Sequence, residues 1–162
     1  MSRLDSFIRR MQAQRSCLNH AADLVRGLPG HVLEFGLGNG RTYDHLRGLL
    51  PERDIYVFDR QINAHPDCIP PADLTFLGDF RETLPQAIAG LGATGVLLHA
   101  DCGTGDDAAN RALADALTPS FVKLAKSGAV LIADRAINAP EFEDLPLPAD
   151  VAPGRYFMYR RV

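Results

Sequence analysis

Hydrophobic and polar positions along the chain follow two different periods, and the changes between them predict its helices and strands. Residues 3–27 carry apolar side chains at three- and four-residue steps, which indicates an amphipathic helix that ends at Gly27. Short apolar runs then alternate with longer segments of helical period. The runs that predict strands are residues 32–35, 54–58, 74–77, 94–100, 129–133 and 155–162, and the segments that predict helices are residues 42–50, 81–91 and 106–125.

This alternation of strands and helices predicts an α/β fold. We expect a doubly wound, Rossmann-like, mostly parallel sheet of seven strands, or six, with helices on both faces and an extra N-terminal helix. Wholly apolar runs such as residues 96–98 suit strands that are covered on both sides. Pro119 predicts an interruption or bend in the last long helix, and the proline-rich residues 136–154 are too short for a further helix and strand.

The composition is that of one soluble globular domain. The chain has 162 residues, of which 46% are hydrophobic and 23% charged, and this length supports a single core. We divide the domain, residues 1–162, into an N-terminal amphipathic helix at 1–28, a ligand-binding core at 30–135 and a C-terminal strand region at 136–162.

Charge and cysteine content limit the partners and the compartment that we expect. The net charge of -3 gives no broad basic field, so a long nucleic acid is not an expected partner. No apolar run approaches the ~18 residues of a membrane span, and the N-terminus lacks the apolar centre of a signal peptide, so we expect no membrane partner. Cys17, Cys68 and Cys102 form no CxxC pair, which suits a cytoplasmic location.

Residues 32–40, with the sequence Val-Leu-Glu-Phe-Gly-Leu-Gly-Asn-Gly, are the most informative segment. An apolar run ends there in three glycines at the spacing G-x-G-x-G, and a helical segment follows. A strand, a glycine turn and a helix in this order form a nucleotide-binding corner, because glycine lets a ligand lie directly on the main chain. The dinucleotide fingerprint G-x-G-x-x-G would place its last glycine at Arg41, so this spacing differs from it.

Acidic residues follow the second to fifth predicted strands: Asp59, Asp79, Asp101 and Asp134. The carboxyl ends of parallel strands meet at one edge of the sheet, where ligands of doubly wound folds bind. This repetition favours a ligand site over an ordinary strand-to-helix turn. Asp59 comes ~20 residues after the glycines and is placed to accept from ribose hydroxyls. Asp79, beside Phe80, can accept from an adenine amino group, cap the next helix, or do both.

The segment Glu34-Phe-Gly-Leu-Gly-Asn-Gly40 resembles motif I of class I S-adenosylmethionine (SAM) methyltransferases. The acids after the second and third strands match that family in place. More narrowly, residues 36–46 and 153–160 are similar to a family of small bacterial SAM methyltransferases. The resemblance implies a SAM-binding core at residues 30–135, SAM as cofactor, S-adenosylhomocysteine as product, and methyl transfer to an unidentified small-molecule acceptor.

The resemblance also implies roles for individual residues. The glycine turn and the following helix would bind the methionine carboxylate, and Glu34 would reach its amino group. Asp59 would bind the ribose, and Asp79 with Phe80 the adenine. The predicted cofactor contacts are Glu34, Phe35, Gly36, Leu37, Gly38, Asn39, Gly40, Thr42, Asp59, Arg60, Asp79, Phe80 and Asp101.

Methyl transfer is an in-line displacement, which chiefly requires alignment of the acceptor atom, the methyl carbon and the sulfur. A hydroxyl or ammonium acceptor must also lose a proton to a general base, whereas a carboxylate acceptor needs none. In class I methyltransferases the end of the fourth strand commonly faces the reacting methyl group, so the resemblance makes Asp101 the candidate catalytic residue. His20 and His99 are further candidates, although a surface position for His20 and a buried structural role for His99 explain them as well.

Residues 128–135 look like the fifth strand of catechol-type O-methyltransferases, which bind a divalent cation through two acids and an Asn. Asp101 and Asp134 match the two acids. Arg135 stands at the Asn position, and an arginine cannot ligate a cation. We therefore expect no metal site, and an Asp134–Arg135 turn held by local ion pairs.

Two other functions share parts of this pattern. A SAM-binding module without catalysis, such as a regulatory subunit, would carry the same corner and lack an acceptor-recognition insertion. An NAD-type oxidoreductase is disfavoured by Arg41 and by the lack of a Tyr-x-x-x-Lys pair.

Two surfaces have open interpretations. The arginines of the first helix form either a solvated face or a lid that meets an anionic group: Arg3, Arg9, Arg10 and Arg15. The apolar residues 156–159 indicate either alternation in a packed strand or a surface that a neighbouring subunit of a homo-oligomer covers.

Overall fold

The computed structural model describes residues 2–162, which form four α-helices, two 3₁₀ helices and seven strands. The helices are α1 (Arg3–Val25), α2 (Arg41–Leu49), η1 (Pro66–Cys68), η2 (Ala72–Leu74), α3 (Phe80–Leu91) and α4 (Asp107–Leu124). The strands are β1 (His31–Phe35), β2 (Ile55–Asp59), β3 (Thr75–Leu77), β4 (Gly95–Ala100), β5 (Ala125–Ala133), β6 (Phe142–Asp144) and β7 (Phe157–Arg161). All the α-helices, and all the strands except β6, overlap a predicted element.

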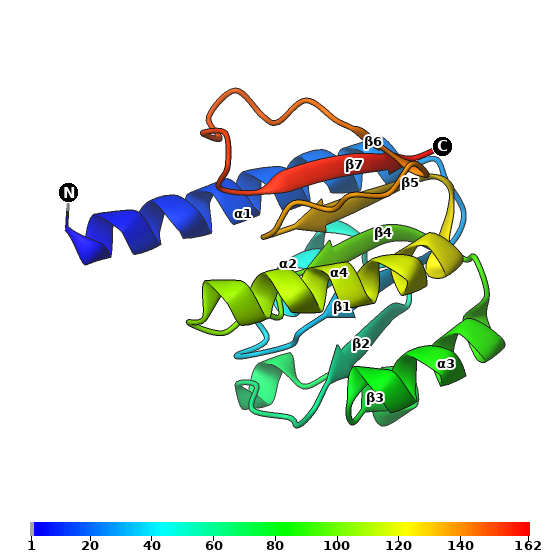
Figure 1. The fold of residues 1–162 in the computed structure, drawn as a ribbon. Coiled ribbons are helices and arrows are strands. Elements are labelled where there is room, and N and C mark those ends of the chain that lie inside the picture. Colours follow the sequence, from blue (N-terminus) through cyan, green and yellow to red (C-terminus); the bar gives the residue numbers. More distant parts are fainter. Residues whose placement is uncertain (1) are drawn as a thin grey trace.

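The seven strands form one sheet in the order β3-β2-β1-β4-β5-β7-β6. Strands β1 to β5 are parallel, whereas β7 runs antiparallel between β5 and β6. The strand order reverses between β1 and β4, and ligands of doubly wound sheets bind outside the carboxyl ends at such a switch point. Figure 1 shows these ends on the left of the view, on the same side as the N-terminus. The predicted mostly parallel sheet is confirmed.

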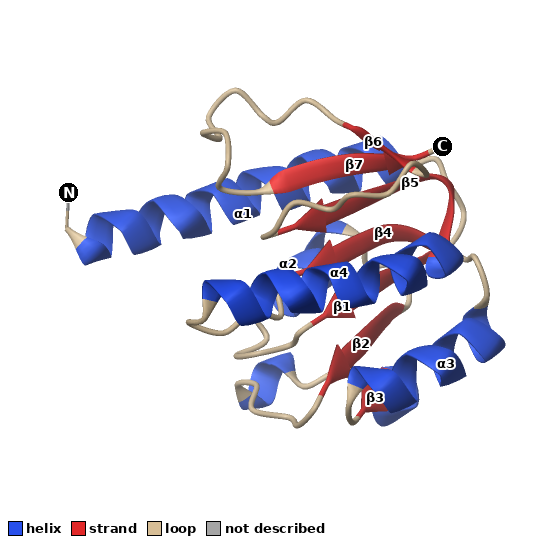
Figure 2. Ribbon diagram, viewed as in Figure 1, coloured by secondary structure: helices blue, strands red, loops and turns tan. Residues whose placement is uncertain are grey.

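Helices cover both faces of the sheet (Figure 2). On one face, α1 and α2 contribute Leu18 and Leu46 to a core with β1, β4 and β5. On the other face, α3 and α4 contribute Leu84 and Phe121 to a second core. Side chains alternate across a strand, so the central strands must be apolar on both sides. Every position of β4 is accordingly buried.

Helix α1 is longer than the part of the sheet that it covers. It begins with a capping box, in which Ser2 Oγ accepts from the Asp5 N–H and the Asp5 carboxylate accepts from the Ser2 N–H. Its buried residues begin at Ala13, so its first turns extend past the carboxyl edge of the sheet (Figure 1). We call residues 3–12 the α1 overhang.

The proline-rich parts differ in two details from the predictions. Helix α4 is not interrupted at Pro119, and a bend there stays a prediction; Asp115, whose carbonyl loses its helical partner there, is exposed, so water can replace the missing hydrogen bond. Residues 136–154 hold no helix, as expected, but they do hold a short strand, β6. Two of its three residues, Glu143 and Asp144, are exposed and charged, and for that reason the strand leaves almost no hydrophobic pattern.

Helix α4 passes into β5 without a loop, because α4 ends at Leu124 and β5 begins at Ala125. Strand β5 has nine residues and pairs with β4 on one side and β7 on the other. It carries the chain back to the carboxyl edge, where residues 134 and 135 follow it. Among residues 2–162, no helix combines the length and the apolar character that crossing a membrane requires.

Candidate functional site

The turn between β1 and α2 is built on three glycines with positive φ: Gly36 (94°), Gly38 (51°) and Gly40 (84°). A Cβ on Gly36 would lie 2.7 Å from the Asp101 carbonyl oxygen, and one on Gly40 would lie 2.5 Å from the Cys68 Cβ. Both positions therefore exclude a side chain, whereas Gly38 has open space around it. Gly40 gives α2 no side-chain cap, which leaves the first N–H groups of the helix for a ligand.

Asp59, at the end of β2, lies beside this turn. Its Oδ2 accepts from the Leu37 N–H at 2.8 Å and the Gly38 N–H at 3.2 Å. Its Oδ1 accepts only one long hydrogen bond, of 3.4 Å, from the Gln61 N–H. Asp59 thus fixes the turn with one oxygen and keeps lone pairs on the other for a ribose hydroxyl, a role that stays a prediction.

Asp79 caps α3, as one of its interpretations expects. Its Oδ1 accepts from the Arg81 N–H and from Arg81 Nε, both at 2.9 Å, and these hydrogen bonds lower the pKa of Asp79 to about 2. Phe80 and Arg60 line the same hollow as Asp59. Asp79 Oδ2 does not take part in the cap and lies near Arg60 and Arg81. Adenine binding by Asp79 and Phe80 is compatible with the capping role and stays a prediction.

Glu34 lies beneath the glycine turn, with no exposed surface. One oxygen accepts from the Thr42 hydroxyl, and the other is 2.8 Å from Nδ1 of His99, which is also fully buried. Burial alone would lower the pKa of His99, but the charge and hydrogen bond of Glu34 outweigh it and raise that pKa. Glu34 therefore joins β1 to α2 and β4, and its predicted contact with the methionine amino group stays untested.

Asp101, after β4, contacts two segments that are distant from it in sequence, α1 and the residue before β7. Arg10 Nη2 lies 2.8 Å from each carboxylate oxygen, and Oδ2 also accepts from Gln14 Nε2 at 2.6 Å and from the Tyr156 hydroxyl at 2.8 Å. Burial opposes the charge of Arg10, yet Asp101 and Tyr156 raise the pKa of this guanidinium overall. Three of these four hydrogen bonds end on Oδ2 and one on Oδ1, and those from Arg10 and Gln14 anchor α1 to the end of β4. The catalytic role of Asp101 stays a prediction.

Asp134, after β5, has far fewer partners. Within residues 2–162 its carboxylate accepts one long hydrogen bond, of 3.4 Å from Arg135 Nη1, although its side chain is only 14% exposed. Burial and the nearby Asp101 raise the pKa of Asp134. Arg135 also pairs with Asp107 at 2.7 Å, which ties the end of β5 to the start of α4. In the described residues, no three His, Cys, Asp or Glu side chains are grouped to hold a metal.

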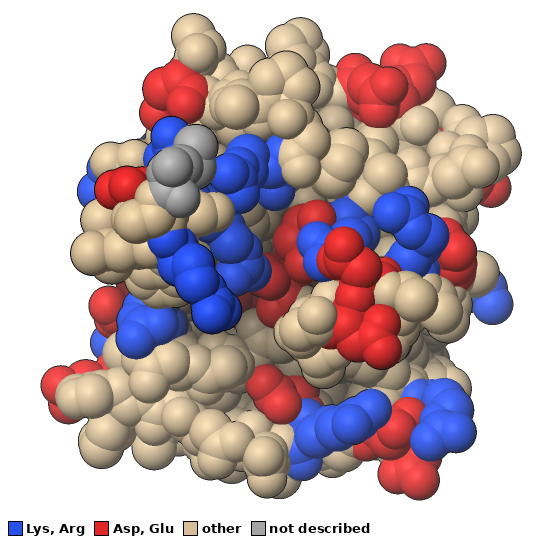
Figure 3. Space-filling model, turned by 60° about the vertical axis from the view of Figure 1, so that its left-hand side comes forward, with Lys and Arg blue, Asp and Glu red and all other residues tan. Residues whose placement is uncertain are grey.

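Two adjoining hollows follow this edge and share Gly36, Gly38 and Asp101. The first, of about 300 Å³, also touches Asp59 and Phe80. The second, of about 230 Å³, lies between the glycine turn and α1. Together they reach the size of ordinary small-molecule sites, ~300–1,000 Å³. Figure 3 looks toward this edge and shows acidic and basic side chains interleaved around a central depression.

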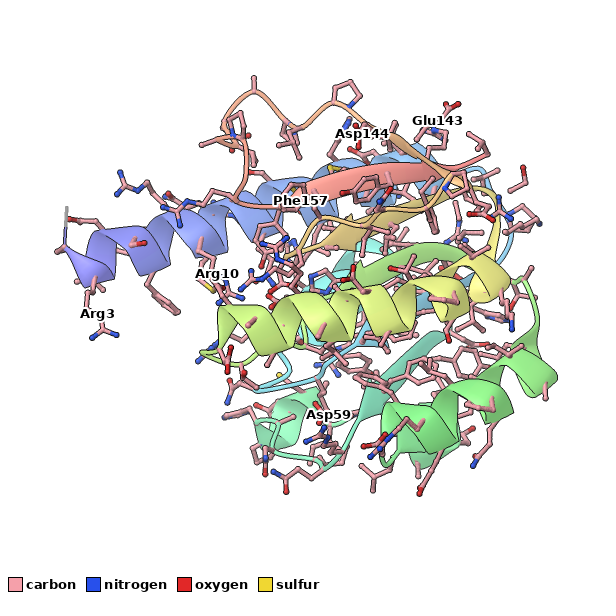
Figure 4. All side chains as sticks on the ribbon, in the orientation of Figure 1. Arg3, Arg10, Asp59, Glu143, Asp144 and Phe157 are labelled. Atoms are coloured by element: carbon pink, nitrogen blue, oxygen red, sulfur yellow. The ribbon has the colours of Figure 1, made fainter. Side chains whose placement is uncertain are left out.

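The α1 overhang and the residues next to it form the outer wall of the second hollow, through Phe7, Arg10, Met11 and Gln14. Figure 4 shows Arg10 on the sheet side of α1 and Asp59 farther along the edge, at the end of β2. Arg10 pairs with Asp101 of the chain itself, so a lid that meets an anionic group of a ligand stays a prediction. Arg3 and Arg9 are exposed, as a solvated face would have them.

Other candidate residues lie outside the hollows. Phe35 is fully buried and its ring stacks on that of Phe58 at 4.7 Å, so its side chain belongs to the core. His20 is exposed on α1 and lines neither hollow. These positions leave His20 without access to the reacting atoms.

The C-terminal apolar residues do not form an exposed surface. Tyr156, Met158 and Tyr159 are at most 4% exposed, because β7 lies inside the sheet between β5 and β6. Alternation in a packed strand therefore explains these three residues, whereas Phe157 is partly exposed. Homo-oligomerisation stays a prediction.

The partners of Asp101 were not predicted. Gln14 left a signal, because it is a polar residue on the otherwise apolar stripe between Met11 and Leu18. Tyr156 left none, because its approach to Asp101 depends on the insertion of β7 beside β5.

The comparisons with known proteins agree with this geometry. A family model described as S-adenosyl-L-methionine methyltransferase matches residues 1–161. The crystal structure of an S-adenosyl-L-methionine methyltransferase from Silicibacter pomeroyi DSS-3 is 44% identical, with a TM-score of 0.95, and the match covers 100% of this chain and 99% of that one. No curated protein matches the sequence.

More distant structures share the fold. The calicheamicin methyltransferase CalS11 is 19% identical with a TM-score of 0.66, covering 98% of this chain and 82% of that one. Cofactor-bound Rv0187 from MTB is 15% identical with a TM-score of 0.60, covering 98% and 88%. With the full-length family match and the close structural relative, the chain belongs to the S-adenosyl-L-methionine methyltransferase family.

Proposed function

We propose that this SAM-dependent methyltransferase acts on a small molecule that binds between the glycine turn, Asp101 and the α1 overhang. The observation that carries the proposal is the second hollow, of about 230 Å³, in which the predicted cofactor residues form the inner wall and Phe7, Arg10 and Met11 of α1 form the outer wall. A space of this size, walled on its outer side by a single helix, suits a small acceptor. The net charge of -3 supplies no basic field for a long nucleic acid.

The residues that line the first hollow and the inner side of the second fit SAM. The uncapped start of α2 offers backbone N–H groups to the methionine carboxylate, and the open space at Gly38 lets that group approach the turn. Asp59 Oδ1 has lone pairs for the ribose, and Phe80 offers a ring for the adenine. When bound, SAM supplies a methyl group on a positively charged sulfur, and the protein's part is alignment.

We assign the two acids at the acceptor side different tasks. Asp101 holds α1 over the site through its hydrogen bonds to Arg10 and Gln14. Asp134 accepts the proton of a hydroxyl or ammonium acceptor, because its carboxylate has free lone pairs and its raised pKa makes it a stronger base. Asp134 lines neither hollow, so this role requires the acceptor to extend past Asp101 into the small cavity that Asp134 lines. A carboxylate acceptor would need no such step.

The test compares Asp134→Asn with Asp107→Asn, which removes the other partner of Arg135. Calorimetry should show unchanged SAM binding in both variants. Methyl transfer from radiolabelled SAM into a bacterial metabolite extract should fall by ~10²–10⁴ in Asp134→Asn only. Undiminished transfer would remove Asp134 from the mechanism, and label in the RNA or protein fraction would contradict a small-molecule acceptor.

A cytoplasmic location belongs to the same proposal. Cys17, Cys68 and Cys102 are all free thiols in the structure, which suits a reducing compartment. Fractionation of cells that express the tagged chain tests this, and recovery from an oxidising compartment would contradict it.

A further inference from the structure

The face of α1 that covers the sheet does not stop where the sheet stops. On the sheet, this face carries Leu18, Ala22 and Val25, all at most 1% exposed. Moving toward the N-terminus, Gln14 occupies the next position on the same face and contacts Asp101. Steps of three and four residues then lead to Met11, and further to the positions of the overhang.

The continuation of this face is apolar but uncovered. Leu4 is 66% exposed, Phe7 51% and Ile8 45%, and with Met11 they keep the helical spacing of a buried stripe. At 1.5 Å per residue, the stripe runs about 15 Å past Gln14. An apolar surface of this length therefore lies over the edge of the sheet, beyond Asp101 and next to the reacting region.

This uncovered stripe is continuous with the site. Phe7 and Met11 line the second hollow together with Gly36 and Asp101. The same two residues, with Ile8, line a groove of about 260 Å³ along the overhang. A molecule in that groove would reach the cofactor corner without crossing any other surface.

Positive charge borders the stripe. Arg15 lines the groove and Arg41 lines the hollow, and in the described chain neither forms an ion pair. The single acid of the two linings is Asp101, which Arg10 already neutralises. If the start of α2 and Arg41 take the methionine carboxylate, Arg15 remains as a cation beside an apolar surface.

We propose that this stripe, formed by Leu4, Phe7, Ile8 and Met11, is the acceptor-binding surface, and that the acceptor is an amphipathic small molecule with an apolar body and an anionic group. The apolar body packs against the stripe, the anionic group pairs with Arg15, and the nucleophilic atom points toward Asp101 and Asp134. This inference rests on the proposed function, because it names the substrate class of the same site.

The test uses 8-anilinonaphthalene-1-sulfonate, an aromatic anion whose fluorescence rises in apolar sites, as the probe. The full chain is first loaded with S-adenosylhomocysteine, so that the cofactor corner is filled. We expect one saturable site in the wild type. The double variant Phe7→Ser, Met11→Ser should raise the dissociation constant roughly tenfold or more, and Arg15→Gln should raise it roughly three- to tenfold.

The matched control is Leu77→Ser, an equally exposed apolar residue on β3 (56%) that should leave probe binding unchanged. Uncharged N-phenyl-1-naphthylamine should bind roughly tenfold more weakly than the anionic probe. Since Phe7, Arg15 and Leu77 are exposed and Met11 is only partly buried, circular dichroism should show every variant folded.

Three results would overturn the inference. The probe shows no saturable site, it binds equally to the double variant, or light scattering finds a dimer that Phe7→Ser dissolves, which would assign the stripe to a second copy. A different result would contradict the proposed function itself, namely calorimetry that shows no binding of S-adenosylhomocysteine to the wild type. Binding of the cofactor product with no probe response counts against the acceptor class alone.

Discussion

Asp59 and Asp101 stand at the same edge of the sheet, but different parts of the chain hold them. The main partners of Asp59 are backbone N–H groups of the glycine turn, which the pairing of β1 with β2 places beside it. The partners of Asp101 come from Arg10, Gln14 and Tyr156, near the two ends of the chain. The cofactor side is therefore built within one pair of strands, and the acceptor side is assembled from remote segments, so the two sides should respond separately to substitution.

The largest loss of stability should come from Glu34→Ala. Glu34 lies beneath both the cofactor side and the acceptor side, so its removal should disturb the two together. Its removal leaves His99 buried without its partner and frees Thr42 of α2. Breaking a buried pair of this kind costs about 3–5 kcal/mol of unfolding free energy. Urea denaturation measures the loss, with the exposed Glu143→Ala as control. A loss near that of the control would show that the pair does not support the turn.

A smaller effect should separate the glycines of the turn. Gly36→Ala places a Cβ 2.7 Å from the Asp101 carbonyl oxygen and strains a φ of 94°, so it should cost about 1–3 kcal/mol. Gly38→Ala meets open space and should cost less stability. Thermal unfolding of the two variants side by side measures the difference. Equal melting temperatures would mean that the close approach of the turn to β4 is not required.

The affinity for SAM should distinguish Asp59 from Asp101 more sharply than stability does. Asp59→Ala should weaken SAM binding by about 1–3 kcal/mol, because the hydrogen bonds to the ribose and to the turn are both lost. Asp101→Ala should weaken SAM binding less, since its partners hold α1. Titration calorimetry with SAM decides this, and equal losses would show that the two sides act as one unit.

The smallest effect on stability should come from Asp79, which is partly exposed. Its pKa in the folded chain is about 2, below the ordinary 3.8, so it stabilises the fold above pH 3.8 and loses this contribution as the pH falls toward 2. The difference in melting temperature between wild type and Asp79→Ala should shrink over that range. A constant difference would mean that the cap does not depend on the carboxylate charge.

The same contrast explains how far the sequence could predict the molecule. The glycine turn and the strand-end acids are local signals, because a strand, its turn and the next helix are contiguous in sequence. Strand β6 was missed because an edge strand of three residues with two charges has no distinct period. The contacts of Arg10 and Tyr156 with Asp101 were missed because they depend on where α1 and β7 pack, and no local pattern encodes that.

The loopless passage from α4 into β5 has a mechanical consequence. No residue separates the helix from the strand at Leu124 and Ala125, and at the opposite end the Arg135–Asp107 ion pair holds them together at 2.7 Å. The two elements are thus joined at both ends, and Asp134 lies next to the second joint. Residues 126–129, where β5 shifts register against β4, can take up an inserted residue, whereas an insertion between Leu131 and Ile132 would move Asp134 relative to Asp101.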